Sequence, residues 1–263
     1  VAKSVKNGHD NQEQFNNSIN TANESSNKLL GTVKNIVLAL GGVTAIKSLV
    51  NLSDTTTSNR SRLELIVDDN GSVAELENKI FAMSNRTRSD FLETSNVVAK
   101  LGILAGDSFK NTDEIVAFTE LMNKNFTISG ASVQEQTAAM YQLTQAMAAG
   151  KLQGDEFRSI MENAPLLAEA IAEYTGKSKG ELKELSSEGL ITADIIKNAM
   201  FASADQINAR YSKMPMTWGQ IWTRMKNVAV KALDPVLVKI NELANNQHCL
   251  LYTSPSPRDG ATS

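Results

Sequence analysis

The chain has 263 residues, which is enough for one large domain or two smaller ones. Its formal net charge of −3 provides no basic surface of the kind that nucleic-acid binding requires, so we expect no specific nucleic-acid partner. The histidines are His9 and His248 and the one cysteine is Cys249, so residues 10–247 lack the side chains that most often act as base, nucleophile or zinc ligand. We therefore expect a structural protein with no enzymatic activity, no catalytic residues, no cofactor and no metal site.

Residues 1–50 are predicted to form a long amphipathic, coiled-coil-like helical region. Apolar or small side chains recur there at spacings of four and three, as in a heptad repeat: Phe15, Ile19, Ala22, Ser26, Leu29, Val33, Ile36 and Leu40. Two arrangements satisfy this pattern, a helix paired in a coiled coil or bundle and a solvated helix lying on the rest of the domain. The pattern leaves open whether a pairing is within one copy or between copies.

The most apolar run of the sequence, Leu29–Val50, lies within this region. Only twelve residues separate Lys34 from Lys47, whereas a helix that crosses a hydrocarbon core needs about 20. A buried helix or a helical hairpin hinged at Gly41–Gly42 is therefore favoured. A marginal membrane span, with both lysines reaching toward the headgroups, is the alternative.

Residues 51–235 are predicted to form a multi-helix globular bundle. A capping residue with Glu three positions later marks four helix starts: Ser72–Glu75, Asp90–Glu93, Ser132–Glu135 and Ser178–Glu181. Further starts are predicted at Asn111 or Thr112, at Thr192 and at Thr217. The segment Leu63–Val67 fits either a short strand or a helix end, and strand signals are otherwise nearly absent. The predicted fold class is all-α, with a long N-terminal heptad helix or helical hairpin followed by the bundle.

The helix that starts at Thr217 carries Ile221, Met225 and Val228 as its apolar stripe. It is predicted to be interrupted or kinked near Asp234–Pro235, because proline lacks the backbone donor that a helix interior needs. Residues 236–248 are predicted to begin a further helix. Residues 249–263 break from the helical pattern and resemble translated sequencing-adaptor read-through, so we interpret them as a non-native tail. We expect both ends of the sequence to be truncated.

Two short motifs suggest a ligand-binding interpretation. In an EF-hand the first ligand is an Asp five residues before the conserved Gly, and Ile66 occupies that position before Gly71, so Asp68–Gly71 is predicted to be a turn. The segment Gly176–Gly180 lacks the upstream glycine of a phosphate-binding loop. It is better interpreted as a helix C-cap at Gly176 followed by an N-cap at Ser178.

Two residue pairs are also candidates for a functional role. The carboxylates of Glu156 and Glu162 could serve glycoside hydrolysis only if they converged, but six residues on a helix leave them about 120° apart. A solvated acidic face is therefore predicted. Trp218 and Trp222 share one helix face, where they could either anchor a partner helix or cover the domain core.

Four segments carry a family resemblance: Phe126–Gly130, Ala146–Phe157, Met161–Pro165 and Glu188–Thr192. In this order and spacing they resemble the tape measure domain near the N-terminus of phage tail tape measure proteins. The resemblance covers roughly residues 50 to 235. The motif residues are Gly150, Lys151, Leu152, Gly154, Asp155, Glu156, Phe157, Glu162, Pro165 and Gly189. They are turn and cap residues, which determine a fold and are not a catalytic signature.

The resemblance implies a helical protein that occupies the tail lumen, sets tail length and scaffolds tube assembly. The partners it implies are the tail tube protein, tail assembly chaperones and tail-tip or baseplate initiator proteins. Self-association through helices and transient contact with the host membrane are also expected. The location it implies is the virion tail lumen, and the host cytoplasm during assembly. The alternatives are a membrane-active helical protein that aids genome ejection, and the non-catalytic part of a tail-associated cell-wall hydrolase.

Overall fold

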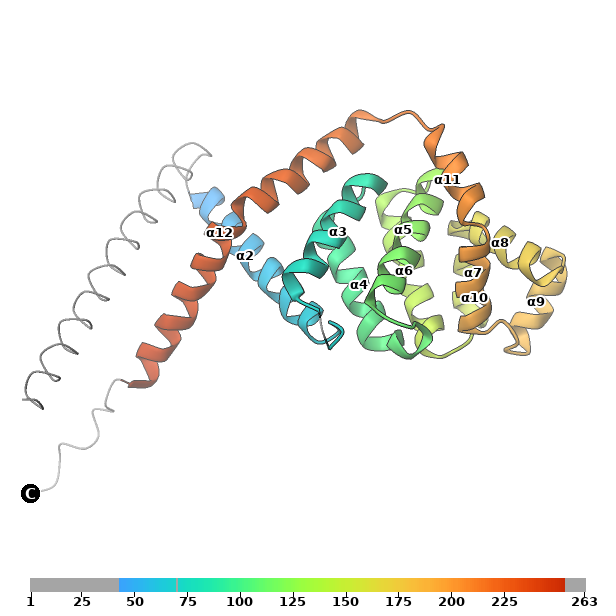
Figure 1. The fold of residues 1–263 in the computed structure, drawn as a ribbon, viewed down its shortest axis with the longest axis horizontal. Coiled ribbons are helices and arrows are strands. Elements are labelled where there is room, and N and C mark those ends of the chain that lie inside the picture. Colours follow the sequence, from blue (N-terminus) through green and yellow to red (C-terminus); the bar gives the residue numbers. More distant parts are fainter. Residues whose placement is uncertain (1–42, 70, 254–263) are drawn as a thin grey trace, which may run out of the picture. The chain divides into compact units, whose positions relative to one another are not determined.

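The computed structural model describes residues 43–69 and 71–253 (Figure 1). The predicted heptad segment Phe15–Leu40, the predicted hinge at Gly41–Gly42 and residues 254–263 lie outside the described residues. Nothing in the structure therefore tests the N-terminal helix.

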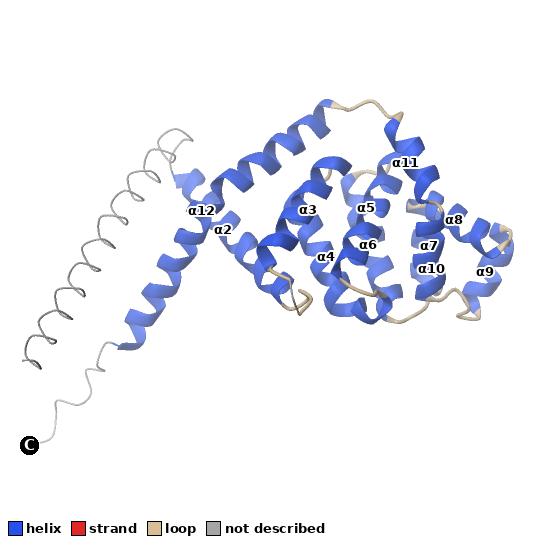
Figure 2. Ribbon diagram, in the orientation of Figure 1, coloured by secondary structure: helices blue, strands red, loops and turns tan. Residues whose placement is uncertain are grey.

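Every regular element within the described ranges is a helix (Figure 2). In chain order they are α2 (Val43–Glu64), α3 (Val73–Thr87), α4 (Phe91–Ala105), the 3₁₀ helix η1 (Gly106–Ser108), α5 (Thr112–Ser129), α6 (Val133–Ala148), α7 (Gly154–Asn163), α8 (Pro165–Thr175), α9 (Lys179–Ser187), α10 (Ala193–Ala202), α11 (Ala204–Ser212) and α12 (Trp218–Thr253). The all-α fold class is confirmed for the part of the chain that the structure describes.

The described residues divide into two compact units, one containing residues 43–54 and 233–253 and the other residues 55–232. In the first unit the described residues belong to the start of α2 and the end of α12. The hydroxyl of Ser53 donates a buried hydrogen bond of 2.7 Å to the carbonyl of Leu237. Both side chains are 1% exposed, so this polar contact joins the two helices inside an apolar setting.

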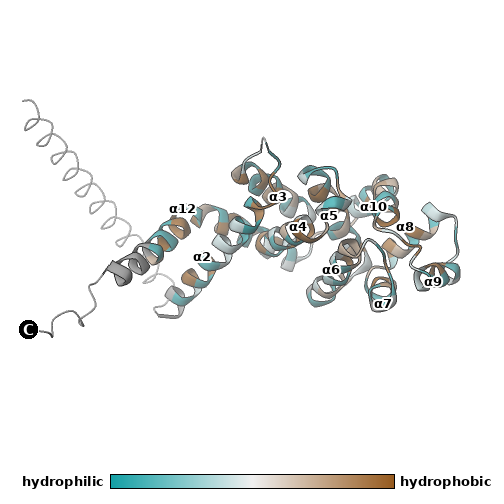
Figure 3. Cartoon of the chain, turned by 90° about the horizontal axis from the view of Figure 1, so that it is seen from below, coloured by the Kyte–Doolittle hydropathy of each residue, from teal (hydrophilic) through white to brown (hydrophobic). Residues whose placement is uncertain are grey.

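Residues 55–232 form a helical bundle around one hydrophobic core. Helix α5 packs against α3, α4 and α11, helix α6 packs against α4 and α7, and α8 packs against α10. Figure 3 shows hydrophilic and hydrophobic faces alternating around these helices. The largest fully buried side chains are Leu63, Ile80, Met83, Leu101, Phe118, Met122, Phe126, Leu143, Met147, Leu152, Ile160 and Leu167. Burial of apolar side chains at helical spacing is the main source of this unit's stability.

The predicted caps define the helix starts. Side chains of Ser72, Asp90, Asn111, Ser132, Ser178 and Thr192 all accept hydrogen bonds from backbone N–H groups in the first helical turn. At Ser132 and Ser178 the Glu three residues later also accepts the cap's own N–H, which completes a capping box. Hydrogen bonds from Ser132 hold the pKa of Glu135 below its ordinary value, and those from Ser178 do the same for Glu181.

Three sequence predictions are resolved or corrected at helix ends. Helix α2 ends at Glu64 and a turn follows, so Leu63–Val67 is a helix end and not a strand. Of the interruption or kink predicted near Asp234–Pro235, the interruption is wrong, because α12 continues through Pro235 to Thr253, and the kink stays a prediction. A proline removes one donor from a helix, and the i→i−4 bonds before and after it continue the ladder. Residues 236–248 therefore extend α12 instead of beginning a new helix.

Candidate functional site

Two turns that are far apart in sequence meet in the second unit. One lies between α6 and α7 and the other between α9 and α10. Lys151 and Thr192 form an isolated antiparallel bridge. The N–H of Leu152 donates to the carbonyl of Ile191 at 2.8 Å, and the N–H of Ala193 donates to the carbonyl of Gly150 at 2.9 Å. We call this arrangement the paired turns.

The paired turns are closed by burial as well as by backbone hydrogen bonds. Leu152 and Ile191 are 0% and 1% exposed, so the side chains beside the bridge belong to the core. The hydroxyl of Ser186, which is also buried, donates to the carbonyl of Leu152 at 3.0 Å. A buried backbone carbonyl without a partner would be costly, and Ser186 removes that cost.

Gly189 fits the second turn for two independent reasons. Its φ of 71° lies in the left-handed region, which glycine adopts without steric cost. A Cβ at this position would lie 2.7 Å from Nε2 of Gln153 and 3.2 Å from Cδ of Lys151. The backbone conformation of the turn therefore requires a glycine, and a side chain at this position would in addition displace the flexible ends of Gln153 and Lys151.

The remaining motif residues lie in the elements that follow the first turn. Gly150 and Gly154 have φ of 74° and 52°, and Gly154 opens α7, which also contains Asp155, Glu156, Phe157 and Glu162. Phe157 is buried and Glu162 is exposed. Pro165 is the first residue of α8, where its missing N–H has no helical partner to lose. Helical rotation separates Glu156 from Glu162 by about 120°.

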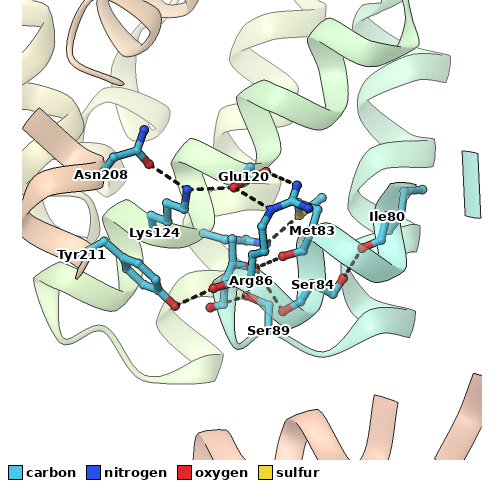
Figure 4. Close-up of polar contacts among 11 residues, drawn as sticks. Ile80, Met83, Ser84, Arg86, Ser89, Glu120, Lys124, Asn208 and Tyr211 are labelled. Atoms are coloured by element: carbon cyan, nitrogen blue, oxygen red, sulfur yellow. Dashed lines mark hydrogen bonds and ion pairs between the residues drawn. The ribbon is translucent and has the colours of Figure 1, made fainter. Parts of the chain in front are cut away.

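A second polar cluster joins α3, α5 and α11 (Figure 4). Arg86 donates two hydrogen bonds to the carboxylate of Glu120, at 3.3 and 2.7 Å, and Lys124 donates to the same carboxylate at 2.8 Å. Lys124 also donates to Asn208 at 2.7 Å, and the hydroxyl of Tyr211 donates to the carbonyl of Arg86 at 3.2 Å. Each of the three helices thus contributes a polar group to one network.

The charges of this network stabilise the contact between the three helices. Burial alone would raise the pKa of Glu120, but hydrogen bonds from Arg86 and Lys124, together with their charges, outweigh it and hold the pKa below its ordinary value. Burial raises the pKa of Tyr211, so its hydroxyl stays protonated and donates. Glu120 is ionised and bound by two cations, an arrangement that joins helices and is unlike that of a general acid or base.

Across residues 43–69 and 71–253 no three or more His, Cys, Asp or Glu side chains are grouped to hold a metal ion. The carboxylate of Asp68, in the segment that suggested a calcium interpretation, accepts hydrogen bonds from the N–H and the hydroxyl of Thr112 at the start of α5. Asp68 is therefore a helix-capping residue.

The family model described as Tape measure protein matches residues 47–237. This range is well over half of the chain and includes both the paired turns and the Glu120 network. The chain belongs to the tape measure protein family. No curated protein and no solved structure matches the chain. Tape measure proteins are structural components of phage tails and are generally not enzymes, so this chain has a structural role in a phage tail.

The tape measure domain contains contacts that the sequence did not reveal. The pairing of Leu152 with Ile191 joins two of the recognised segments, and only their common small turn residues hinted at it. Asn227 on α12 is 1% exposed, accepts from the N–H of Phe91 at 2.9 Å and donates to the carbonyl of Ser89 at 2.8 Å. A lone Asn within a largely apolar helical stretch was the available signal.

The two tryptophans of the tape measure chain are both on the surface. Trp218 and Trp222 are 85% and 70% exposed, so the interpretation that they cover the domain core is wrong. The face of α12 that docks on the domain is the one with Asn227, because its buried hydrogen bonds fix the helix rotation. Within the described ranges no helix is both long enough and apolar enough to cross a bilayer.

Proposed function

We propose that this chain sets the length of a phage tail and scaffolds the tail tube that polymerises around it. The match to the tape measure family over residues 47–237 is the observation that carries the proposal. The helical character of every regular element in the described ranges supports it. An extended helix adds about 1.5 Å per residue, so a residue count converts directly into a length.

The bundle of residues 55–232 is poorly suited to act as the ruler itself. Its helices are short, such as α9 with nine residues and α10 with ten, and tight turns fold them back on one another. Such a unit gains far less than about 1.5 Å of length per residue. We therefore assign measurement to helical sequence outside the bundle, and a fixed, anchoring role to the bundle.

This assignment gives the domain organisation a functional meaning. Residues 51–235 form the tape measure domain, residues 1–50 form a helical region before it, and residues 236–248 continue the helical sequence after it. Residues 249–263 are a non-native tail in this scheme. The motif residues of the two turns, Gly150, Lys151, Leu152 and Gly189, act by holding the paired turns together, which keeps the anchoring bundle rigid.

The proposed partners follow from the tail role. They are the tail tube protein, which surrounds the tape, the tail assembly chaperones, which cover it before assembly, and the tail-tip or baseplate initiator, which holds one end. The proposed locations are the host cytoplasm during assembly and the tail lumen in the virion. A formal net charge of −3 fits protein partners better than nucleic acid.

The test is a set of in-frame deletions in helical sequence of the full gene outside residues 47–237. Tails measured by electron microscopy should shorten in proportion, by about 1.5 Å for each residue removed. As a matched control, replacing the deleted segment with an unrelated helical sequence of equal length should restore the original tail length. Tails that keep their length after deletion would show that the chain does not measure.

A further inference from the structure

Helix α12 has an apolar face that points away from the domain. Its most exposed side chains are Trp218 at 85%, Trp222 at 70%, Met225 at 58% and Val228 at 57%. Ile221, Ala229 and Ala232 lie at three- and four-residue spacings between and after them, which places all of these residues on one side of the helix. We call these seven residues, which lie between Trp218 and Ala232, the outer face of α12.

The opposite side of α12 is held against the domain by polar contacts. Asn227 is buried and hydrogen-bonds both to the N–H of Phe91 and to the carbonyl of Ser89. Lys226 forms an ion pair of 2.7 Å with Asp90 at the start of α4. At about 100° per residue, Asn227 lies nearly opposite Met225 on the helix.

Arg88 holds the start of the same helix. Its guanidinium donates to the carbonyls of Met214 and Pro215 and to the side chain of Gln220, at 2.9, 3.0 and 3.2 Å. The outer face therefore cannot rotate inward without breaking buried hydrogen bonds at Asn227 and the contacts of Arg88. It is presented to the outside as a fixed surface.

Side-chain size changes along the outer face. The first half carries the large side chains of Trp218, Ile221 and Trp222, and the second half carries the smaller ones of Val228, Ala229 and Ala232. Met225 lies between the two halves. Two such faces in antiparallel orientation bring large side chains opposite small ones, whereas parallel orientation brings large against large and leaves a gap between the small ones.

We propose that the outer face of α12 binds the same face of a second copy of this chain, antiparallel, about a two-fold axis near Met225 and Val228. In this register Met225 packs against Val228 of the second copy, and Ile221 packs against its Ala232. Trp222 lies beside Ala229 of the second copy. Each contact occurs twice, as an isologous interface requires.

The exposed area is sufficient for a specific dimer. An aromatic side chain buries about 150–250 Å², so the two tryptophans supply about 300–500 Å² per copy. With Ile221, Met225 and Val228 the face supplies on the order of 600 Å² per copy, and the pair exceeds the threshold of about 1,000 Å² expected of a specific interface. Large exposed apolar patches of this kind are uncommon on monomers.

Shape favours a second copy of the chain over an anionic lipid surface, whereas charge alone would favour the lipid. No Asp or Glu occurs from Gln206 to Leu233, and Arg224 and Lys231 flank the outer face, so an anionic surface would attract it. A fluid lipid surface, however, places no requirement on the order of large and small side chains, and so leaves the size gradient unexplained. The salt dependence of binding distinguishes a second copy from a lipid surface. Salt screens the repulsion between like-charged copies and so strengthens their pairing, whereas it weakens attraction to anionic lipid.

The pairing belongs to free copies of the chain. Antiparallel helices direct the sequence after α12 of the two copies in opposite directions. A tape that runs along a tail tube has one direction, so the antiparallel pairing is proposed for copies that are not inside a tube. The inference stands on the outer face alone, and it holds or fails whether or not the chain sets tail length.

The tryptophans provide a local measurement, because the chain contains only the two on this face. In the full chain, raising the protein concentration should shift tryptophan emission to the blue and reduce quenching by acrylamide. Because salt screens the repulsion between copies, these changes should occur at a lower protein concentration in high salt than in low salt. Met225→Lys should raise the concentration needed by about tenfold or more, since it places like charges at the interface centre. Leu104→Lys, at a 54% exposed site on α4, is the matched control and should change nothing.

Cross-linking tests the orientation. In a Cys249→Ser background, a short thiol cross-linker should join Ile221→Cys to Ala232→Cys in a mixture of the two variants, and should not join either variant to itself. Self-joining of Ile221→Cys, or tryptophan emission that is independent of protein concentration, would overturn the proposal. So would a blue shift that appears only with phosphatidylglycerol vesicles and weakens as salt is added. Sedimentation equilibrium reports the accompanying mass.

Discussion

Gly189→Ala tests the paired turns, because the structure gives it two separate penalties. The residue has φ of 71°, and an added Cβ would lie 2.7 Å from Nε2 of Gln153. Gly130 has nearly the same φ, 73°, but a Cβ added there would meet no other atom within 4 Å. Comparing alanine at the two positions therefore separates the backbone penalty from the contact between the turns.

The expected magnitudes follow from these two penalties. Placing alanine in the left-handed region costs about 1–2 kcal/mol, and this is all that Gly130→Ala should lose. At Gly189 the end of the Gln153 side chain must also shift, which adds up to about 0.5–1.5 kcal/mol. For a domain of this size each kcal/mol lowers Tm by about 2–4 °C. The Tm of Gly189→Ala should therefore be a few degrees lower than the Tm of Gly130→Ala.

The assay is thermal unfolding followed by circular dichroism on the purified chain. Shortening the neighbour with Gln153→Ala should recover the additional loss at Gly189 and leave the backbone penalty in place, in a double-mutant cycle. Equal losses for Gly189→Ala and Gly130→Ala would refute the reasoning. A Gln153→Ala variant that recovers nothing would place the cost elsewhere than in the contact between the turns.

Two further predictions concern polar groups that the fold brings together. Asn227→Leu should lower the free energy of unfolding by about 2–3 kcal/mol, because it leaves the N–H of Phe91 and the carbonyl of Ser89 without their partner. Denaturant titration measures this loss. An unchanged unfolding midpoint would show that Asn227 does not hold α12 on the domain. Glu120→Gln should cost about 1–2 kcal/mol at neutral pH. Because the pKa of Glu120 is lowered in the folded chain, its contribution is complete above the ordinary value of 4.5 and is lost as the pH falls through the folded pKa. The difference between wild type and variant should therefore narrow in acid, and a difference that stays constant with pH would contradict the network.

The helix starts of this protein are determined by its sequence. Ser72, Ser132 and Ser178 cap helices where the pattern of a small polar residue with Glu three positions later predicted them. A capping bond joins groups three residues apart, so its energy depends on no distant part of the chain. The family motif could be recognised for the same reason, because its turn residues occur at fixed, short spacings.

The tertiary structure alone decided which of these local elements meet. The hydrogen bond between Leu152 and Ile191 joins two turns about 40 residues apart, and neither turn specifies the other by its spacing. Of the interruption or kink predicted near Asp234–Pro235, the interruption does not occur, since one missing donor did not break the helix that continues on both sides.

Helix α12 shows most clearly what could not be predicted from the sequence. Its apolar periodicity was determined by the sequence, and an apolar stripe on a globular helix ordinarily faces the core. Here the hydrogen bonds of buried Asn227 hold the other side inward and leave Trp218 and Trp222 exposed. The sequence determined where helices begin and which faces are apolar, because those properties are local. Only the packed structure decided which face is buried, because that depends on polar partners supplied by Ser89 and Phe91, more than 130 residues away in the chain.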